Sequence, residues 1–91
     1  MTICERFGRN VRAVRLAAGL SQEGLADLCG SGRTYISGIE RGAENPTLSK
    51  SDDVASALGV TICELLLENI QPVAERVRAE RRAVARARRN R

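Results

Sequence analysis

The side chains of this 91-residue chain with the most capacity for chemistry are the basic ones, and they are unevenly placed. Residues 1–71 hold seven basic and nine acidic groups, a net charge of −2, whereas residues 72–91 hold eight arginines against Glu75 and Glu80, a net of +6. A mildly acidic body with a strongly basic C-terminal segment favours a polyanionic partner such as nucleic acid. A solvated, arginine-rich helix without a dedicated partner is the alternative.

Catalytic and metal-binding side chains are scarce. The chain has no histidine, which removes the commonest general base and the commonest metal ligand. The three cysteines, Cys4, Cys29 and Cys63, form no CxxC pair, and their odd number argues against a disulfide framework. We therefore expect no enzyme activity, no metal and no cofactor. We expect Cys29 and Cys63 to occupy core positions on helices, as small apolar residues.

Length and composition predict one small, all-α domain. The hydrophobic fraction is 43%, and Phe7 and Tyr35 are the only aromatic residues. The core must therefore be built from Leu, Ile, Val and Ala, a composition that suits packed helices. No apolar run is long enough to span a bilayer, so we expect no membrane contact and a cytoplasmic location. So small a domain offers little concave apolar surface, and we expect no small-molecule ligand.

Glycines and capping residues divide the chain into five predicted helices. Apolar residues recur at i, i+4, i+7 and i+11 from Phe7 onward, which predicts a first helix that stops at Gly19. Ser21 is a good N-cap for the second helix. Thr61 and Glu64 have the spacing of a capping box that opens the fifth helix. The predicted helices cover about residues 5–18, 22–29, 33–41, 48–58 and 62–68.

Pro72 marks the predicted boundary between a domain of residues 1–71 and a C-terminal tail of residues 72–91. The tail is rich in Ala, Arg and Glu, which are strong helix formers. Its apolar residues, Val73, Val77 and Val84, are too sparse to define a core face, so we expect a marginal helix that frays at its end. The tail either contacts phosphates or is solvated, and a second dimer contact is the remaining alternative.

Two short predicted helices joined by a turn that contains Gly30 and Gly32 have the arrangement of a helix-turn-helix, whose second helix enters the major groove of DNA. The stretch GLSQEGLADLCGSGRTYISGIERGAENPTL, residues 19–48, resembles the lambda-repressor and Cro (XRE-type) family of DNA-binding proteins. Within it, RTYISGIERG, residues 33–42, resembles the recognition helix of restriction-modification controller proteins, small dimeric regulators of their own operons. The resemblance covers about residues 5–68 and implies a five-helix lambda-repressor-like domain.

The resemblance places Arg33 and Thr34 at the start of the recognition helix, where side chains reach base edges. An arginine there can pair bidentately with guanine O6 and N7, and a threonine can donate to a base or touch a thymine methyl. Gln22, at the start of the second helix, is expected to contact the DNA backbone and to brace a recognition-helix side chain. The implied DNA-binding residues are Gln22, Arg33, Thr34, Tyr35, Ser37, Gly38, Arg41 and Asn45.

Some of these residues have alternative roles. Tyr35 can equally be a partly buried core aromatic, and Arg41 can be a solvated side chain. Gly38 is expected to let the recognition helix sit close to DNA. Arg15 and Glu40 match a family pair that joins the first and third helices, so we assign both to structure rather than to DNA.

Several residues depart from the family pattern. Ser31 stands where an apolar residue usually plugs the turn, and Gly32 stands where Ser or Asp usually caps the recognition helix; loss of a cap costs ~1 kcal/mol. Glu44 places a negative charge where controller proteins often have a cation, which puts DNA contacts from this loop in doubt. Ser51 and Asp52 replace apolar residues, so the start of the fourth helix is either loosely packed or faces solvent or a partner.

A single domain of this size offers few contacts, so we expect a homodimer that binds half-sites of double-stranded DNA about 10–10.5 bp apart, or a multiple of that. The resemblance suggests that the dimer forms through the fourth and fifth helices. Three adjacent leucines cannot all face a core on a 3.6-residue period. Part of their surface is therefore expected to bury against a second copy, and a fully buried helix is the alternative. The candidate interface residues are Ile62, Leu65, Leu66, Leu67 and Ile70.

These observations predict a sequence-specific transcription regulator that acts at a pseudo-palindromic operator, either by occupying a promoter or by recruiting polymerase. A restriction-modification controller is the more specific form of this prediction. The alternative is an antitoxin or another interaction protein that binds a protein partner through its helices or its tail.

Overall fold

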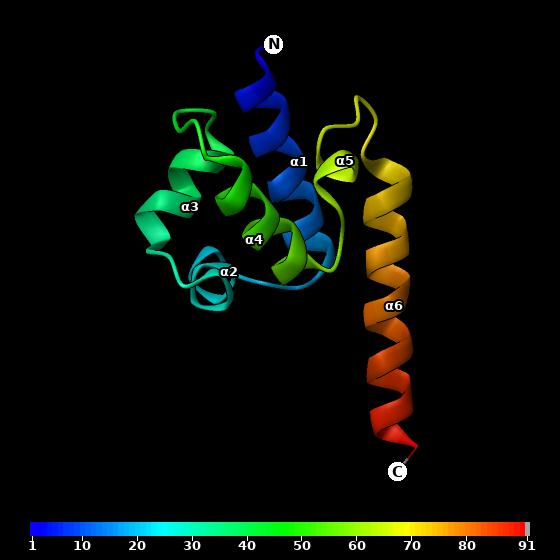
Figure 1. Ribbon diagram of the computed structural model, residues 1–91. Helices are drawn as coiled ribbons and strands as arrows, with labels where there is room; N and C mark the ends of the chain where they lie inside the picture. The colour runs from blue at the N-terminus through cyan, green and yellow to red at the C-terminus, as the bar shows by residue number, and fades with distance from the viewer. Residues whose placement is uncertain (91) are drawn as a thin grey trace.

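The computed structural model describes residues 1–90 and contains six helices, of which the last extends well beyond the body formed by the others (Figure 1). Among these residues there is no strand, and the predicted all-α class is confirmed. Within the same residues, no helix combines the length and the apolar character needed to cross a membrane. The helices are α1 (Ile3–Ala17), α2 (Gln22–Cys29), α3 (Arg33–Glu40), α4 (Leu48–Leu58), α5 (Ile62–Leu65) and α6 (Gln71–Arg89).

Local capping signals set most of the helix ends. The Ser21 hydroxyl accepts a hydrogen bond from the Gly24 backbone N–H at 2.9 Å, and the predicted capping box that opens α5 is present. A second capping box, made by Thr2 and Glu5, starts α1 at Ile3, two residues earlier than predicted. Gly19, just past the end of α1, has a φ of +74°, a left-handed conformation that favours glycine.

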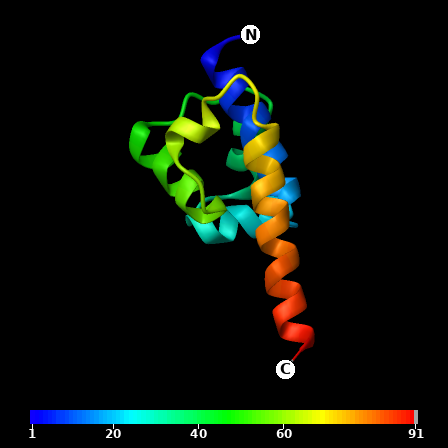
Figure 2. The same ribbon diagram turned by 90° about the vertical axis from the view of Figure 1, so that its right-hand side faces the viewer.

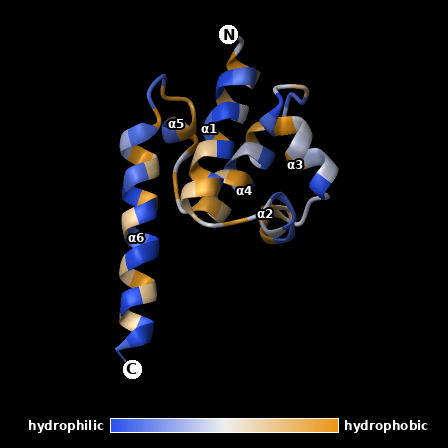
Figure 3. Ribbon diagram, turned by 180° about the vertical axis from the view of Figure 1, so that it is seen from behind, coloured by the Kyte–Doolittle hydropathy of each residue, from blue (hydrophilic) through white to orange (hydrophobic). Residues whose placement is uncertain are grey.

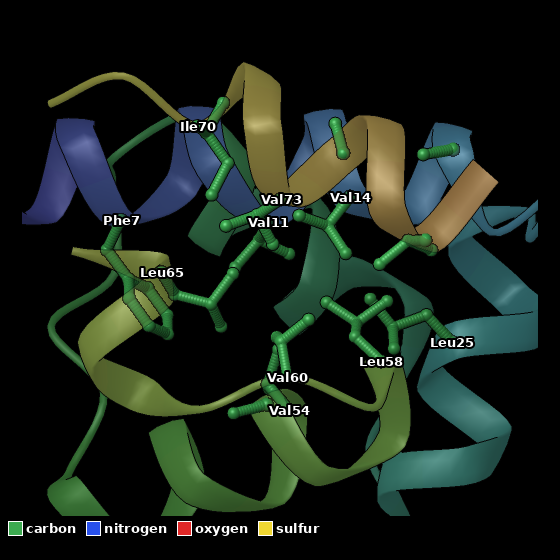
Figure 4. Close-up of a cluster of buried hydrophobic side chains, with 14 of the residues drawn as sticks. Phe7, Val11, Val14, Leu25, Val54, Leu58, Val60, Leu65, Ile70 and Val73 are labelled. Carbon is green, nitrogen blue, oxygen red and sulfur yellow. The ribbon is translucent and has the colours of Figure 1, made fainter. Parts of the chain in front are cut away.

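The core forms around α1, which lies between α3 and α6 (Figures 1 and 3). Val11 and Val14 of α1 are fully buried, and Figure 4 shows them among side chains from α2, α4, α5 and α6. On the α3 side, Gly8 allows a close approach, because a Cβ placed there would lie 2.0 Å from the Ile39 carbonyl oxygen. A single glycine therefore sets the spacing between α1 and the third helix.

The fifth helix is shorter than predicted, ending at Leu65 rather than near residue 68. The fully buried Asn10 side chain on α1 donates hydrogen bonds to the backbone carbonyl oxygens of Leu65, at 2.8 Å, and Leu67, at 2.7 Å. Arg9 donates in the same way to the carbonyl of Glu68, at 2.8 Å. Because α1 supplies these donors, the chain can leave the helix without orphaned carbonyls.

The sixth helix corrects the expectation for the tail. Its first turns pack along α1 (Figure 2), and Val73, Ala74 and Val77 are buried there together with Ile70. These four residues recur at i, i+3, i+4 and i+7, one helical face. The prediction that the tail has no core face was therefore wrong, because Ile70 and Ala74 complete it. Of the three valines of the tail, only Val84 is exposed, at 53%.

The structure tests two predictions about burial, one for the cysteines and one for the polar residues at the start of α4. Cys29 is half-buried and packs against the core, whereas the prediction of a core position for Cys63 was wrong, because Cys63 is exposed. At the start of α4, Ser51 is buried and its hydroxyl donates to the Thr47 carbonyl oxygen at 2.8 Å, which satisfies the polar group locally. Asp52 faces solvent. The polar start of α4 is thus accommodated by a back-bonded serine and an exposed carboxylate.

Candidate nucleic-acid interface

Helices α2 and α3 are joined by a three-residue turn. Gly30 ends α2 in a left-handed conformation, with a φ of +67°, and Gly32 precedes α3 without a side-chain cap, as expected. The Ser31 hydroxyl accepts a hydrogen bond from the Lys50 ammonium of α4 at 2.7 Å. A polar link to α4 therefore stands where the resemblance led us to expect an apolar plug. No local signal in the sequence indicates this pair, whose members lie 19 positions apart.

The third helix buries one face and presents the other to solvent. Ile36 and Ile39 are buried against the body, whereas Arg33 and Thr34 are exposed and Ser37 is half-exposed. Because side chains three and four residues apart share a helix face, Thr34 and Ser37 lie on the same side. The first two turns of α3 therefore present a guanidinium and two hydroxyls outward from the body.

A buried ion pair fixes α3 against α1. Arg15 donates from Nε to Glu40 Oε2 at 2.6 Å and from Nη2 to Glu40 Oε1 at 3.0 Å, and its third nitrogen donates to the Leu20 carbonyl oxygen at 2.9 Å. Glu40 Oε1 also accepts from the Gln22 side-chain amide at 3.2 Å. The assignment of Arg15 and Glu40 to structure is confirmed, and the same network holds Gln22 at the start of α2.

Glu44 covers part of the recognition helix. Gly38 is buried, and a Cβ placed there would come 2.8 Å from Glu44 Cγ. The Glu44 side chain occupies the space beside Gly38, so it would have to move before DNA could approach α3 at this glycine. Burial, and to a lesser extent the negative charge of Glu44, raise the pKa of the half-buried Tyr35 hydroxyl. Tyr35 packs partly against the core and carries its polar end toward this acidic side chain.

The remaining candidates lie at the C-terminal end of α3 and in the loop that follows. Arg41 is exposed and donates a hydrogen bond to the Ser37 hydroxyl one turn earlier. Asn45 is exposed, and its side-chain oxygen lies 3.8 Å from the Cys4 sulfur. Both side chains are accessible, and the Arg41 guanidinium keeps further N–H donors beside this bond for a phosphate or a base.

The candidate dimer residues divide into two groups. Leu65 and Ile70 are buried in the core of the protomer itself, so the expectation that they bury against a second copy does not hold. Leu65 lies among the core side chains drawn in Figure 4. Ile62 and Leu66 are half-buried, and Leu67 is 44% exposed. Ile70 is buried where α6 docks along α1, and Leu65 is buried where α5 packs against α1 and α4.

Comparison with known proteins places this arrangement in a family. The Helix-turn-helix family model matches residues 11–65, from α1 to α5. Control protein C.BamHI of Bacillus amyloliquefaciens is 48% identical over 61 residues, which cover 66% of this chain and 75% of that protein. Control protein C.SmaI of Serratia marcescens is 44% identical over 66 residues, which cover 72% of this chain and 79% of that protein.

A solved structure gives the same result. The restriction-modification controller protein C.AhdI from Aeromonas hydrophila matches with a TM-score of 0.66 at 44% identity, over 68% of this chain and 94% of that one. The exposed first turn of α3, the turn that joins it to α2 and the buried pair behind it are the parts of a helix-turn-helix. The chain belongs to the lambda-repressor/Cro-like helix-turn-helix family of DNA-binding transcription regulators, and within it is similar to the restriction-modification controller proteins.

Proposed function

We propose that this regulator binds a pseudo-palindromic operator as a homodimer, with α3 in the major groove of each half-site, and that it acts as a restriction-modification controller. The observation that carries the proposal is the exposure of Arg33 and Thr34 at the first turn of α3, on a helix whose other end is locked by the Arg15–Glu40 pair. Rigid placement matters, because a base-reading side chain must keep its position to discriminate.

The chemistry of the first turn fits base recognition. Arg33 can pair bidentately with the O6 and N7 of a guanine, a contact worth about 1–3 kcal/mol of discrimination. The N-terminus of α3 has no side-chain cap, which leaves its first backbone N–H groups and the positive end of the helix dipole for a phosphate. Gln22, held by Glu40, is positioned for a second phosphate at the start of α2.

Exposed apolar residues support a homodimer. We call three apolar residues the α5 surface: Ile62 and Leu66, which are half-buried, and Leu67, which is exposed. Ile62 and Leu66 also line an apolar groove of about 180 Å³ with residues of α1 and of the α3–α4 loop, and Leu48 beside it is 79% exposed. A contiguous apolar patch on so small a protein is typical of an interaction site. A second copy that covered it would place two recognition helices on one duplex.

The recognition-helix assignment is tested by selecting sites from a random duplex library at physiological salt. Wild-type protein should enrich a pseudo-palindrome with half-sites one helical turn or a multiple apart. Arg33→Ala should lose discrimination at one base pair of each half-site, about 1–3 kcal/mol per contact. Arg12→Ala, which removes an exposed arginine from α1, is the matched control and should select the wild-type site.

Two results would contradict the proposal. One is enrichment of no sequence by wild-type protein. The other is an Arg33→Ala protein that selects the wild-type site with unchanged preference. Co-purification of a stoichiometric second protein, together with absence of an enriched site, would favour an interaction protein instead.

The dimer is tested by sedimentation of a pair of matched leucine variants. Leu67→Glu, on the α5 surface, should shift the protein toward monomer, because a charge would be buried at the interface. Leu28→Glu, at a leucine of α2 that is 61% exposed, should leave the dimer intact. If the two variants sediment alike, the α5 surface is not the interface.

A further inference from the structure

The free half of α6, residues 79–89, buries no residue against the body. Every residue from 79 to 90 is exposed, whereas the preceding turns are buried against α1. The last contact with the body is made by Arg81, whose Nη1 lies 3.4 Å from the Ala17 carbonyl oxygen. The helix then continues past α2 into solvent (Figure 1). It also lies outside residues 11–65, which the family model matches.

Arginines line one side of α6 from Arg78 to Arg89. Arg78, Arg82, Arg86 and Arg89, together the arginine stripe, recur at i, i+4, i+8 and i+11, so they share a face about 16 Å long at 1.5 Å rise per residue. Arg82, Arg86 and Arg89 of the stripe also line one hollow, together with Arg81 and Ala85. From Arg81 to Arg89 the sequence contains five arginines and no acidic residue. Like charges at this spacing repel one another, and an anionic partner would relieve that repulsion.

The stripe is remote from the recognition helix. In Figures 1 and 3 α1 lies between α3 and α6, and in Figure 2, with α6 toward the viewer, α3 lies behind the body. Contacts tie α1 to each of these helices. A duplex seated on the outward face of α3 therefore lies across the protein from the stripe. This position does not favour contact between the stripe and the phosphates that flank the groove read by α3.

We propose that the arginine stripe is a second, sequence-independent nucleic-acid site that holds the phosphate backbone of a duplex segment other than the one read by α3. A row of guanidinium groups matches a row of phosphates, and each contact formed releases counterions. The anchored first half of α6 presents the row on an ordered helix. One protomer then holds two segments of DNA, one by its bases and one by its backbone.

The composition of the free half argues against other occupants. A membrane-surface helix carries large apolar residues opposite its basic face, and the apolar residues of this segment are alanines and Val84. A protein interface needs a large aromatic or aliphatic anchor, and Val84 is the one aliphatic residue of this segment larger than alanine. A second copy of α6 would bring a like charge against the stripe. A nucleic-acid backbone needs no apolar anchor.

The test compares full-length wild-type protein with a variant in which all four stripe arginines are changed to Gln. Glutamine keeps helix propensity, and because three of the four positions are exposed and Arg78 is half-buried, the unfolding midpoint should change little. Binding to a random-sequence duplex is followed by fluorescence anisotropy over a range of salt concentrations. The salt slope should fall in magnitude by about 3–4, because each phosphate that an arginine neutralises contributes about 0.9 to it. Changing the same four arginines to Lys keeps the charge and should keep most of the slope.

A capture experiment tests whether the two segments are separate. Wild-type protein bound to a bead-tethered duplex should retain a soluble labelled duplex, and the four-Gln variant should bind the tethered duplex but retain little of the second. Arg33→Ala should still capture the labelled duplex, which separates failure of this proposal from failure of base recognition by α3.

Three results would overturn the proposal. An unchanged affinity and salt slope in the four-Gln variant would remove the stripe from nucleic-acid binding. A reduced slope with no capture by wild-type protein would place the stripe on the duplex that α3 reads. An acidic protein that binds wild type but not the four-Gln variant, with DNA affinity unchanged, would identify a protein as the occupant.

Discussion

Removal of the Arg15 guanidinium should be among the most damaging single changes to this fold. The side chains of Arg15 and Glu40 are only 9% and 4% exposed, and two hydrogen bonds of 2.6 and 3.0 Å join them. Arg15→Met keeps an unbranched side chain of similar length but deletes the charge. Glu40 is then left buried with Gln22 as its one remaining side-chain partner.

The expected loss follows from the burial of the pair. Breaking a buried ion pair by removing one partner costs about 3–5 kcal/mol, because the other charge stays in a medium of low dielectric constant. The total stability of a chain of this length is about 5–14 kcal/mol. The unfolding midpoint should therefore fall by roughly 12–40 °C, at about 4–8 °C per kcal/mol.

Thermal and urea unfolding followed by circular dichroism would measure this loss. Arg12→Met, at an exposed position of the same helix, is the control and should change stability by less than about 0.5 kcal/mol. The double variant Arg15→Met/Glu40→Met should recover most of the loss, because no unpaired charge remains. The reasoning would be refuted if Arg15→Met matched Arg12→Met, or if the double variant were as unstable as the sum of its single changes.

Three further changes test other contacts. Asn10→Leu should cost about 1–3 kcal/mol of stability for each of the two carbonyls that lose a donor. Amide hydrogen exchange should become faster around the end of α5, and unchanged exchange there would contradict the role of Asn10. Gly8→Ala should lower stability by about 1–3 kcal/mol, since the new methyl meets a backbone carbonyl. Gly38→Ala displaces only a flexible side chain, so it should lose less stability in parallel urea titrations. Hydrogen bonds from Arg76 and from the Thr61 backbone hold the pKa of Glu64 below its usual value. The stability that ionised Glu64 gives the fold is therefore present above its unfolded pKa and is lost as pH falls through the lowered folded pKa. Arg76→Gln should therefore reduce the difference in unfolding midpoint between neutral and strongly acid solution, and an unchanged difference would show that the contact does not stabilise the fold.

The sequence alone determined the parts of this protein that depend on neighbours three or four residues away. The cap at Ser21, the capping box at Thr61 and the stop at Gly19 are read from local spacing, and each appears as predicted. The exposed and buried faces of α3 follow from the helical period in the same way. A helix-turn-helix was predictable because its signals are local.

Tertiary structure decided what depends on residues far apart in the chain. Asn10 ends α5 through carbonyls 55 and 57 positions away, and Arg81 meets Ala17 across 64 positions. The core face of α6 was missed because Val73 and Val77 look isolated until Ile70 joins them against α1. That docking buries Ile70 and leaves Leu67 open, which changes the surface available to a second copy. Local spacing fixes which residues share a helix face, but only packing between helices decides whether that face meets the core, a partner or solvent.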